Sequence, residues 1–320
     1  MSESTPNDVV SAPTAVLSFS PVVLSAPSRA VDLQVKVSAP ATGTELPIIL
    51  LSHGHGRSNH LSSLNGYAPL ADFWAAHGFV MIQPTHLSSK TLARSVDPDD
   101  PEAPLFWRTR AQDMTRILDQ LDVIEATVPQ LQGRLDRSKV AVVGHSLGGQ
   151  TASMLLGARL TDPQDGTEVN LADPRIKAGV LLAAPGRGGD ALSEAAAKNF
   201  PFFSTMDFSA MAAPALVVAG DKDVSPHLTV QGWEWHADPY HLAPGPKSLL
   251  TLFDAGHMLG GISGYDAAET TDENPERVTA IQQLTWAYLR TELYPADSAW
   301  QAACDALTAG DNSLGRVESK

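Results

Sequence analysis

Residues 139–149 read Lys-Val-Ala-Val-Val-Gly-His-Ser-Leu-Gly-Gly. The β-branched apolar run predicts a buried strand, and the apolar residues 151–160 predict the start of a helix. Between them stands G-x-S-x-G, which in a strand–turn–helix setting is typical of a nucleophile elbow, a tight turn that exposes the serine hydroxyl. The serine backbone in such a turn is strained, so the residues two before and two after it must lack bulky side chains. We therefore predict that Ser146 is a nucleophile rather than part of a structural glycine-rich turn.

Strands and helices are expected to alternate on both sides of this stretch. Continuous apolar runs predict buried strands, alternation at 31–37 predicts a half-buried edge strand, and apolar residues at helical spacing predict helices. Besides the strand before Ser146 and the helix after it, we expect strands at 31–37, 48–51, 79–82, 178–184, 215–219 and 249–253, and helices at 67–77, 105–128 and 275–293. This order predicts an α/β protein with a doubly wound, mostly parallel sheet and helices on both faces.

No linker or internal repeat divides the chain. We expect a flexible N-terminal tail over residues 1–13 and a single domain over 14–320. Two loop-rich segments, near 84–107 and 185–213, are expected to form a small cap or lid, because long loops in compact domains are usually functional. Aromatic residues concentrate in three segments outside the predicted sheet, near 106–107, 200–208 and 233–235, and they could bury an apolar acyl or alcohol group of a substrate. The candidate pocket residues are Trp107, Phe203, Met206 and Trp233.

The composition argues against several classes of protein. The 320 residues are 43% hydrophobic, enough for a sizeable core, and the formal net charge is −14. This charge disfavours binding to nucleic acid or to anionic membranes, which requires clustered Lys and Arg. Acidic residues stand at the N-terminus where a signal peptide has basic ones, and no apolar run approaches the length of a membrane span. We therefore expect a soluble, cytoplasmic protein. The sequence leaves open whether it is a monomer or a homodimer.

A serine hydroxyl needs a general base, and the base needs an orienting group. In doubly wound sheets, catalytic groups lie on loops after the carboxyl ends of strands. The last two expected strands lead into Asp221 and Asp223, and into His257. The resulting order of serine, aspartate and histidine is that of α/β-hydrolases. We favour Asp223 as the acid, because Asp221 fits better as a solvated turn carboxylate beside Lys222.

An oxyanion hole should offer two backbone N–H groups to the developing oxyanion. One is expected from Leu147, directly after the nucleophile. The other is expected from the glycine-containing loop Ser-His-Gly-His-Gly at 52–56, in which we choose the N–H of His55. His53 and His55 also form an H-x-H pair, but only His60 follows at ligand spacing, so we expect no metal site there.

His145 and Cys304 are expected to have structural rather than catalytic roles. His145 stands beside the nucleophile and is expected to be a packing or hydrogen-bonding neighbour rather than a second base. Cys304 is the single cysteine, and its surroundings look helical and offer no cationic partner in sequence. It therefore fits a packing residue better than a nucleophile. The expected site requires no metal and no cofactor.

The motifs at 53–56, 144–149, 220–223 and 256–257, in this order, resemble those of α/β-hydrolase-fold serine esterases. Residues 47–56, Pro-Ile-Ile-Leu-Leu-Ser-His-Gly-His-Gly, are similar to the corresponding segment in one branch of these enzymes. This branch includes bacterial chlorophyllase-like proteins, platelet-activating-factor acetylhydrolases and dienelactone hydrolases. The resemblance covers roughly residues 31–293. It implies the following roles: Ser146 as nucleophile, His257 as base, Asp223 as acid, and His55 and Leu147 as oxyanion donors.

The chain departs from two members of this branch. Dienelactone hydrolases have a cysteine where this chain has Ser146, and plant chlorophyllases resemble Gly-His-Ser-Arg-Gly-Gly where this chain has Leu147. Both departures argue against the substrates of those two enzymes. Haloalkane dehalogenases and epoxide hydrolases are disfavoured as well, because they have aspartate at the elbow.

The expected function is hydrolysis of small to medium apolar or aromatic carboxylic esters through an acyl-enzyme. The rate should rise through about pH 6–7, as a histidine base becomes neutral. A lipase, a thioesterase or a polyester hydrolase with the same triad is an alternative. An alternative of another class is a non-catalytic homologue that binds a small molecule.

Overall fold

The computed structural model describes residues 10, 12–264, 267–308 and 313–320. The strands of the main sheet are β1 (Val16–Leu24), β2 (Leu33–Pro40), β3 (Leu46–Ser52), β4 (Val80–Pro84), β5 (Leu135–His145), β8 (Ile176–Leu182), β9 (Ala215–Gly220), β10 (Lys247–Leu252) and β11 (Gly315–Ser319). A separate pair consists of β6 (Arg159–Thr161) and β7 (Glu168–Asn170). The α-helices are α1 (Ala68–Ala76), α2 (Trp107–Asp119), α3 (Leu121–Thr127), α4 (Leu147–Leu155), α5 (Glu194–Asn199), α6 (Asp238–Leu242), α7 (Pro275–Leu293) and α8 (Ala299–Thr308).

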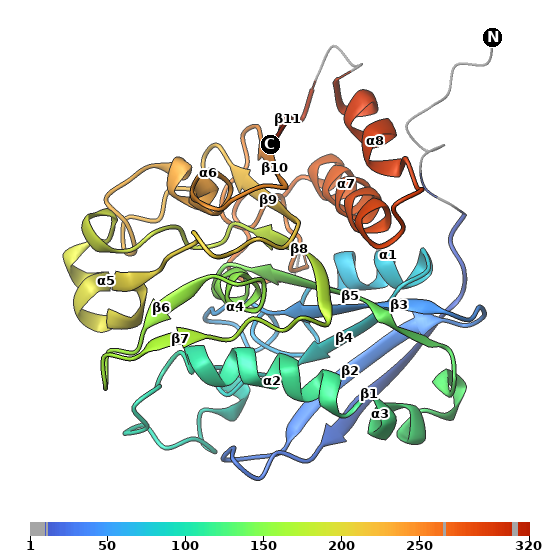
Figure 1. Cartoon of the computed structure of the whole chain (residues 1–320), viewed down its shortest axis with the longest axis horizontal. Helices are drawn as coiled ribbons and strands as arrows, with labels where there is room; N and C mark the ends of the chain where they lie inside the picture. The colour runs from blue at the N-terminus through green and yellow to red at the C-terminus, as the bar shows by residue number, and fades with distance from the viewer. Residues whose placement is uncertain (1–9, 11, 265–266, 309–312) are drawn as a thin grey trace.

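The strands are ordered so that the later ones extend the sheet in one direction from β5. Within the described residues the sheet has nine strands, in the order β1-β2-β4-β3-β5-β8-β9-β10-β11 (Figure 1). From β4 to β10 each strand pairs in parallel with its neighbour, whereas β1, β2 and β11 pair antiparallel. The carboxyl ends of the parallel strands therefore meet at one edge, where the loops after β3, β5, β9 and β10 come together.

The core lies on both faces of this sheet. In β3, Ile48 and Leu50 belong to the hydrophobic layer that includes residues of α2, α3 and α4. Ile49 and Leu51 belong to the opposite layer, which includes residues of α1 and α7. Successive side chains of a strand point to opposite faces, so a strand covered on both faces must be apolar throughout. The predicted α/β fold with a mostly parallel sheet is confirmed.

The position of the predicted edge strand was wrong. Strand β2 lies between β1 and β4, and β1 is the outer strand on that side. We expected no strand at 16–24, where the apolar pattern is interrupted. The pairing of β1 with β2 changes register between Phe19 and Val22, beside Pro21, so neither strict alternation nor a continuous apolar run identifies this strand. We also missed β6, β7 and β11, which are short or polar.

Two predicted helices have different bounds. The helix expected at 105–128 is divided into α2 and α3 at Gln120, whose backbone leaves the helical region at φ −115° and ψ 23°. The helix after Ser146 begins at Leu147, so it includes Gly148 and Gly149, and it ends at Leu155. Those two glycines delayed the predicted start because glycine disfavours helices. Gly157 follows the helix with φ +114°, a conformation that favours glycine.

Most of the predicted tail, residues 1–9 and 11, lies outside the described residues. That residues 14–320 form one domain with a cap near 84–107 and 185–213 stays a prediction. No helix in the described part of the chain combines the length and apolar composition that crossing a membrane requires.

Candidate active site

Ser146 occupies the sharp turn between β5 and α4. Its backbone has φ 54° and ψ −122°, a strained conformation for a residue with a side chain. The Ser146 N–H donates to the carbonyl oxygen of Leu182 in β8, 2.9 Å away, which fixes the turn to the sheet. Gly148 packs against β3, and a Cβ there would lie 2.0 Å from the carbonyl oxygen of Ser52. The elbow thus depends on glycine where the motif has it.

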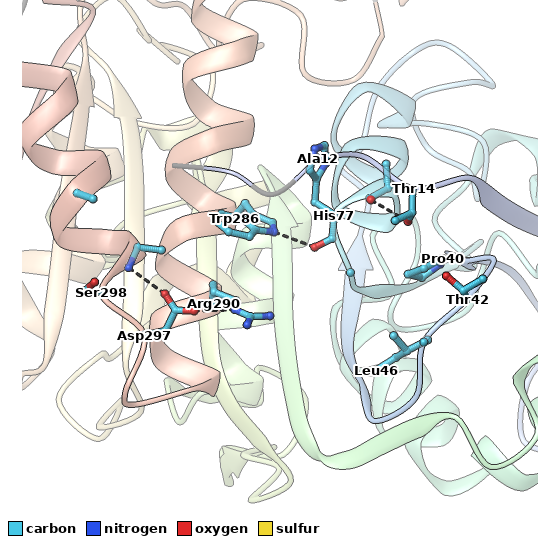
Figure 2. Close-up of a pocket in the computed structure, with 15 residues that line it drawn as sticks. Ala12, Thr14, Pro40, Thr42, Leu46, His77, Trp286, Arg290, Asp297 and Ser298 are labelled. Atoms are coloured by element: carbon cyan, nitrogen blue, oxygen red, sulfur yellow. Dashed lines mark hydrogen bonds and ion pairs between the residues drawn. The ribbon is translucent and has the colours of Figure 1, made fainter. Parts of the chain in front are cut away.

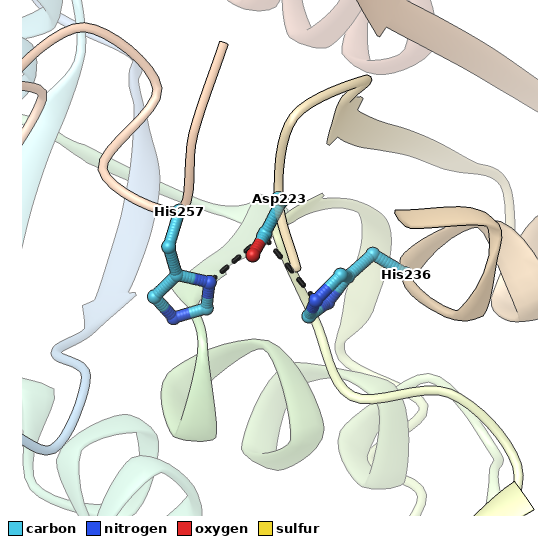
Figure 3. Close-up of side chains that lie close together, drawn as sticks. All are labelled: Asp223, His236 and His257. Carbon is cyan, nitrogen blue, oxygen red and sulfur yellow. Dashed lines mark hydrogen bonds and ion pairs between the residues drawn. The ribbon is translucent and has the colours of Figure 1, made fainter. Parts of the chain in front are cut away.

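His257 and Asp223 stand on the loops after β10 and β9, which are neighbours in the sheet. The Nε2 atom of His257 lies 2.9 Å from the Ser146 hydroxyl oxygen. Its Nδ1 atom lies 2.8 Å from Oδ2 of Asp223 (Figure 3). The structure therefore brings together the three side chains that the sequence singled out, and Ser146 and His257 are partly exposed. Their catalytic roles stay predictions.

Asp221, the alternative acid, is directed elsewhere. Its Oδ1 accepts the backbone N–H of Asp254 at 2.8 Å, in the turn after β10. Its side chain lies 4.0 Å from Nζ of the exposed Lys222. Of the two aspartates, Asp223 is the one in contact with the His257 ring.

His236 is a second histidine beside Asp223, and no motif or spacing predicted it. It lies in the 3₁₀ turn Trp233–Ala237, is buried, and has Nε2 3.3 Å from Oδ2 of Asp223 without hydrogen-bond geometry (Figure 3). Its Nδ1 donates to the carbonyl oxygen of Ala184 at 2.9 Å. Burial raises the pKa of the Asp223 carboxyl, but the imidazoles of His236 and His257 outweigh burial and hold the pKa well below its ordinary value.

The ligand-type atoms of Asp223, His236 and His257 all lie within 4.8 Å of one another. A tetrahedral zinc with bonds of about 2.0–2.1 Å would keep its ligand atoms about 3.3 Å apart. The separation of His257 Nδ1 and Asp223 Oδ2 is 2.8 Å, which is a hydrogen-bond distance. We therefore interpret the cluster as a carboxylate between two imidazoles.

The expected oxyanion donors lie on either side of the elbow. Leu147 is the first residue of α4, where helix amides have no intrahelical partner. His55 follows β3, and its side chain is exposed. His53 is buried, with Nδ1 donating to the Gly54 carbonyl and Nε2 accepting the N–H of His86. Both nitrogens of His53 are thus used within the protein, and the donor roles of His55 and Leu147 stay predictions.

A buried arginine supports the loop after β3. Arg110 of α2 is fully buried, and its guanidinium donates to the carbonyl oxygen of His53 and to the hydroxyl of Ser52. It also donates to the hydroxyl of Ser88 at 2.6 Å and to that of Thr151 at 3.1 Å. The sequence held a sign of this role, because Arg110 falls on the apolar face of a predicted helix, four residues before Met114.

The candidate pocket residues lie in or against the core. Trp107, Phe203 and Met206 are buried, and Trp233 packs against the same layer while partly exposed. Trp107 stacks on Phe202 with 5.6 Å between ring centroids. Their contact with a substrate stays a prediction.

A cavity of 380 Å³ lies beside the predicted oxyanion loop. Its lining combines His55 with the segment that follows β4. The other lining residues are Leu87, Ser88, Ser89, Lys90, Ala93, Val96, Pro98, Ala103, Pro104 and Phe106. The residues are mainly apolar, as is usual for small-molecule sites.

Another cavity, of 670 Å³, lies at the opposite end of the strands, near the first residue of β3 (Figure 2). Several of its polar groups bond to one another. The Trp286 indole N–H donates to the carbonyl oxygen of His77 at 2.9 Å, and Arg290 pairs with Asp297 at 2.8 Å. It is remote from the loops that carry Ser146 and His257, and we assign it no part in the site.

Comparison with known proteins gave two matches. Residues 14–163 match the family model described as chlorophyllase. Over 147 residues, the chain is 28% identical to platelet-activating factor acetylhydrolase of Cavia porcellus. This match covers 36% of the chain and 33% of that relative. The findings confirm the resemblance to this branch of α/β-hydrolase-type serine esterases. The region matched to the chlorophyllase model includes Ser146 and ends before Asp223 and His257.

Proposed function

We propose that this protein is a serine hydrolase that cleaves carboxylic esters through an acyl-enzyme intermediate. The observation that carries the proposal is the continuous line from the Ser146 hydroxyl through the His257 ring to the Asp223 carboxylate, with separations of 2.9 Å and 2.8 Å. A nucleophile, a base and an orienting acid in contact form the arrangement that acyl transfer requires.

The reaction has two halves. The Ser146 hydroxyl oxygen attacks the ester carbonyl carbon while His257 Nε2 takes the hydroxyl proton, and the tetrahedral intermediate then expels the alcohol, which receives that proton. A water molecule next attacks the acyl-enzyme, again giving a proton to His257. The breakdown of the second intermediate returns the proton to Ser146 and releases the carboxylic acid.

Asp223 orients the base and stabilises its charged form. Because its pKa is held low, it stays a carboxylate and keeps the Nδ1 proton of His257 on the side away from Ser146. Nε2 is then free to accept the serine proton. The backbone N–H groups of His55 and Leu147 would stabilise the oxyanion formed at each tetrahedral stage.

The cavity beside His55 has a size and a lining that suit an apolar acyl group of small to medium length. A volume of 380 Å³ falls at the lower end of the range for small-molecule sites, and side chains such as Leu87, Val96 and Phe106 line it. Ala93→Trp should reduce kcat/KM for p-nitrophenyl hexanoate more than for the acetate. Ala172→Trp, at an exposed position, is the control and should change neither.

The decisive test is covalent labelling of the folded protein by a fluorophosphonate probe. Wild type should be labelled at Ser146 and should hydrolyse p-nitrophenyl acetate, whereas Ser146→Ala should do neither. Ser138→Ala, at an exposed serine eight residues earlier, should behave as wild type. Folded wild type that is not labelled would favour the non-catalytic binding homologue instead.

The same triad would serve a lipase, a thioesterase or a polyester hydrolase. These alternatives differ in the alcohol or thiol that leaves and in the length of the acyl chain. Turnover of p-nitrophenyl esters from two to sixteen carbons, of acyl thioesters and of a polyester film separates them. The cavity leads us to expect short and medium acyl chains as the preferred class.

A further inference from the structure

Two buried side chains connect the loop after β3 with the loop that carries His257. Tyr67, directly before α1, and His145, directly before Ser146, are at most 1% exposed. The Tyr67 hydroxyl lies 3.0 Å from the backbone nitrogen of Gly54 and 2.8 Å from Nδ1 of His145. Nε2 of His145 lies 2.8 Å from the carbonyl oxygen of His257. Segments separated by more than a hundred residues thus meet in one chain of hydrogen bonds.

The proton positions in this chain follow from the chemistry of its two ends. The His257 carbonyl can only accept, so Nε2 of His145 carries a proton and donates. Burial, followed by the neighbouring His257, lowers the pKa of His145 to about 3, so the ring is neutral and its Nδ1 has a free lone pair. The Tyr67 hydroxyl therefore donates to Nδ1, and its oxygen accepts the N–H of Gly54. All three hydrogen bonds therefore run in the same direction, from the Gly54 N–H through Tyr67 and His145 to the His257 carbonyl oxygen.

Geometry ties this chain to the elements that the reaction needs. Gly54 directly precedes His55, the predicted oxyanion donor, and a Cβ on Gly54 would lie 2.9 Å from the Tyr67 hydroxyl oxygen and 3.2 Å from His145 Nδ1. The loop therefore rests directly on both side chains. The other end of the chain holds the backbone of the proposed base rather than its ring. Tyr67 and His145 thus connect the predicted oxyanion loop with the loop that carries His257.

We propose that Tyr67 and His145 are positioning residues, which hold the predicted oxyanion loop and the backbone of the base His257 at a fixed separation. This inference rests on the proposed function. Neither side chain is given contact with the substrate, and both act through the groups that they hold. Their loss should therefore lower kcat while KM changes little, because the substrate still binds but the transition state is stabilised less well.

The first test is Tyr67→Phe, which keeps the buried ring and removes the hydroxyl. The change leaves the Gly54 N–H and His145 Nδ1 without this partner, and kcat for p-nitrophenyl acetate should fall roughly 10- to 100-fold. The assay is run where unfolding curves show the variant fully folded. Tyr288→Phe, at another tyrosine that is 2% exposed, is the control and should keep the wild-type kcat.

Two substitutions of His145 test its two hydrogen bonds separately, the one to Tyr67 and the one to the His257 carbonyl. In His145→Asn, the amide oxygen can replace Nδ1 and accept from Tyr67, but nothing reaches the His257 carbonyl. In His145→Gln, the amide nitrogen can replace Nε2 and donate to that carbonyl, but the acceptor for Tyr67 is lost. Both variants should lower kcat. Adding Tyr67→Phe to His145→Gln should lower kcat by less than the product of the two separate effects, because the two side chains hold the same pair of loops through connected hydrogen bonds.

The outcomes separate this inference from the proposed function. Wild type that hydrolyses the ester, with an unchanged kcat in folded Tyr67→Phe and in both His145 variants, would overturn the positioning role alone. A fall in stability without a fall in kcat would do the same, since it indicates a structural role. If Tyr67→Phe does not fold, the two His145 variants decide. Wild type without turnover removes the proposed function and this inference together.

Discussion

Gly144 and Gly148 touch across the elbow, and a Cβ on Gly144 would lie 1.9 Å from the carbonyl oxygen of Gly148. The contact is between backbone atoms, which cannot move aside as a flexible side chain can. Gly144→Ala should therefore open the elbow, with a loss of about 3 kcal/mol in the free energy of unfolding and loss of fluorophosphonate labelling.

The control for this change is Gly166→Ala. Gly166 has φ +72°, but among the described residues no atom lies within 4 Å of an added Cβ. Only backbone strain of about 1 kcal/mol is expected there. Equal losses for the two variants in urea unfolding would show that the collision at the elbow does not matter.

Asp223→Asn should lower kcat by about 10⁴-fold, because an amide can favour the wrong tautomer of His257 and cannot stabilise its charged form. Asp221→Asn should stay close to wild type, since Asp221 accepts the N–H of Asp254 and lies outside the proposed triad. Steady-state kinetics with p-nitrophenyl acetate measures both. A larger loss for Asp221→Asn would reverse the assignment of the acid.

Arg110→Lys should destabilise the fold and slow the reaction, although the charge is kept. A lysine cannot reproduce the fork that serves the His53 carbonyl and the hydroxyls of Ser52, Ser88 and Thr151. The expected loss is about 3 kcal/mol in urea unfolding.

Arg108→Lys is the matched control, two residues away on α2. Arg108 is partly exposed and pairs with Asp162, so a loss of about 1 kcal/mol or less is expected. Similar losses for the two variants would mean that the buried hydrogen bonds of the Arg110 guanidinium do not stabilise the fold more than an exposed ion pair does.

Lys247 should make stability depend on pH in the alkaline range. It is 1% exposed and donates to the carbonyl oxygens of Ala213, Pro244 and Pro246. Burial lowers its pKa from 10.5 to about 8. Between these values the unfolded chain binds more protons than the folded one, so the free energy of unfolding should rise with pH.

Urea unfolding at several pH values from 8 to 10.5 measures this effect, as the difference between wild type and Lys247→Met. The variant should lack the rise. Lys177→Met, at an exposed lysine that also donates to a carbonyl, should keep it. Identical pH slopes for wild type and Lys247→Met would contradict the prediction.

The sequence predicted the fold where local patterns were strong. The apolar runs of β3, β5, β9 and β10 identified strands buried on both faces, and the strand-end rule placed Asp223 and His257 near Ser146. Strand β1 escaped because Pro21 and a register shift break its pattern. The predicted start of α4 was too late. Gly148 lies in the first turn because only a residue without a Cβ fits against Ser52, and helix propensities do not account for such a tertiary contact.

The supporting residues of the site could not be predicted in the same way. Tyr67 contacts His145 across 78 positions of sequence, and no spacing rule connects them. His236 is one of ten histidines, and only the packing of its turn against Asp223 distinguishes it. Arg110 was not predicted either, although its charge on the apolar face of a predicted helix was a signal that could have found it.

The pairing of β9 with β10 would make the proposed activity depend on a local event in the sheet. Asp223 and His257 leave these two strands within a few residues of their last paired positions, Gly220 and Leu252. Transient fraying at this end would separate Asp223 from His257 while the rest of the sheet stays intact. Inactivation in denaturant should therefore precede global unfolding, and a covalent adduct on the serine should slow hydrogen exchange in the final residues of both strands.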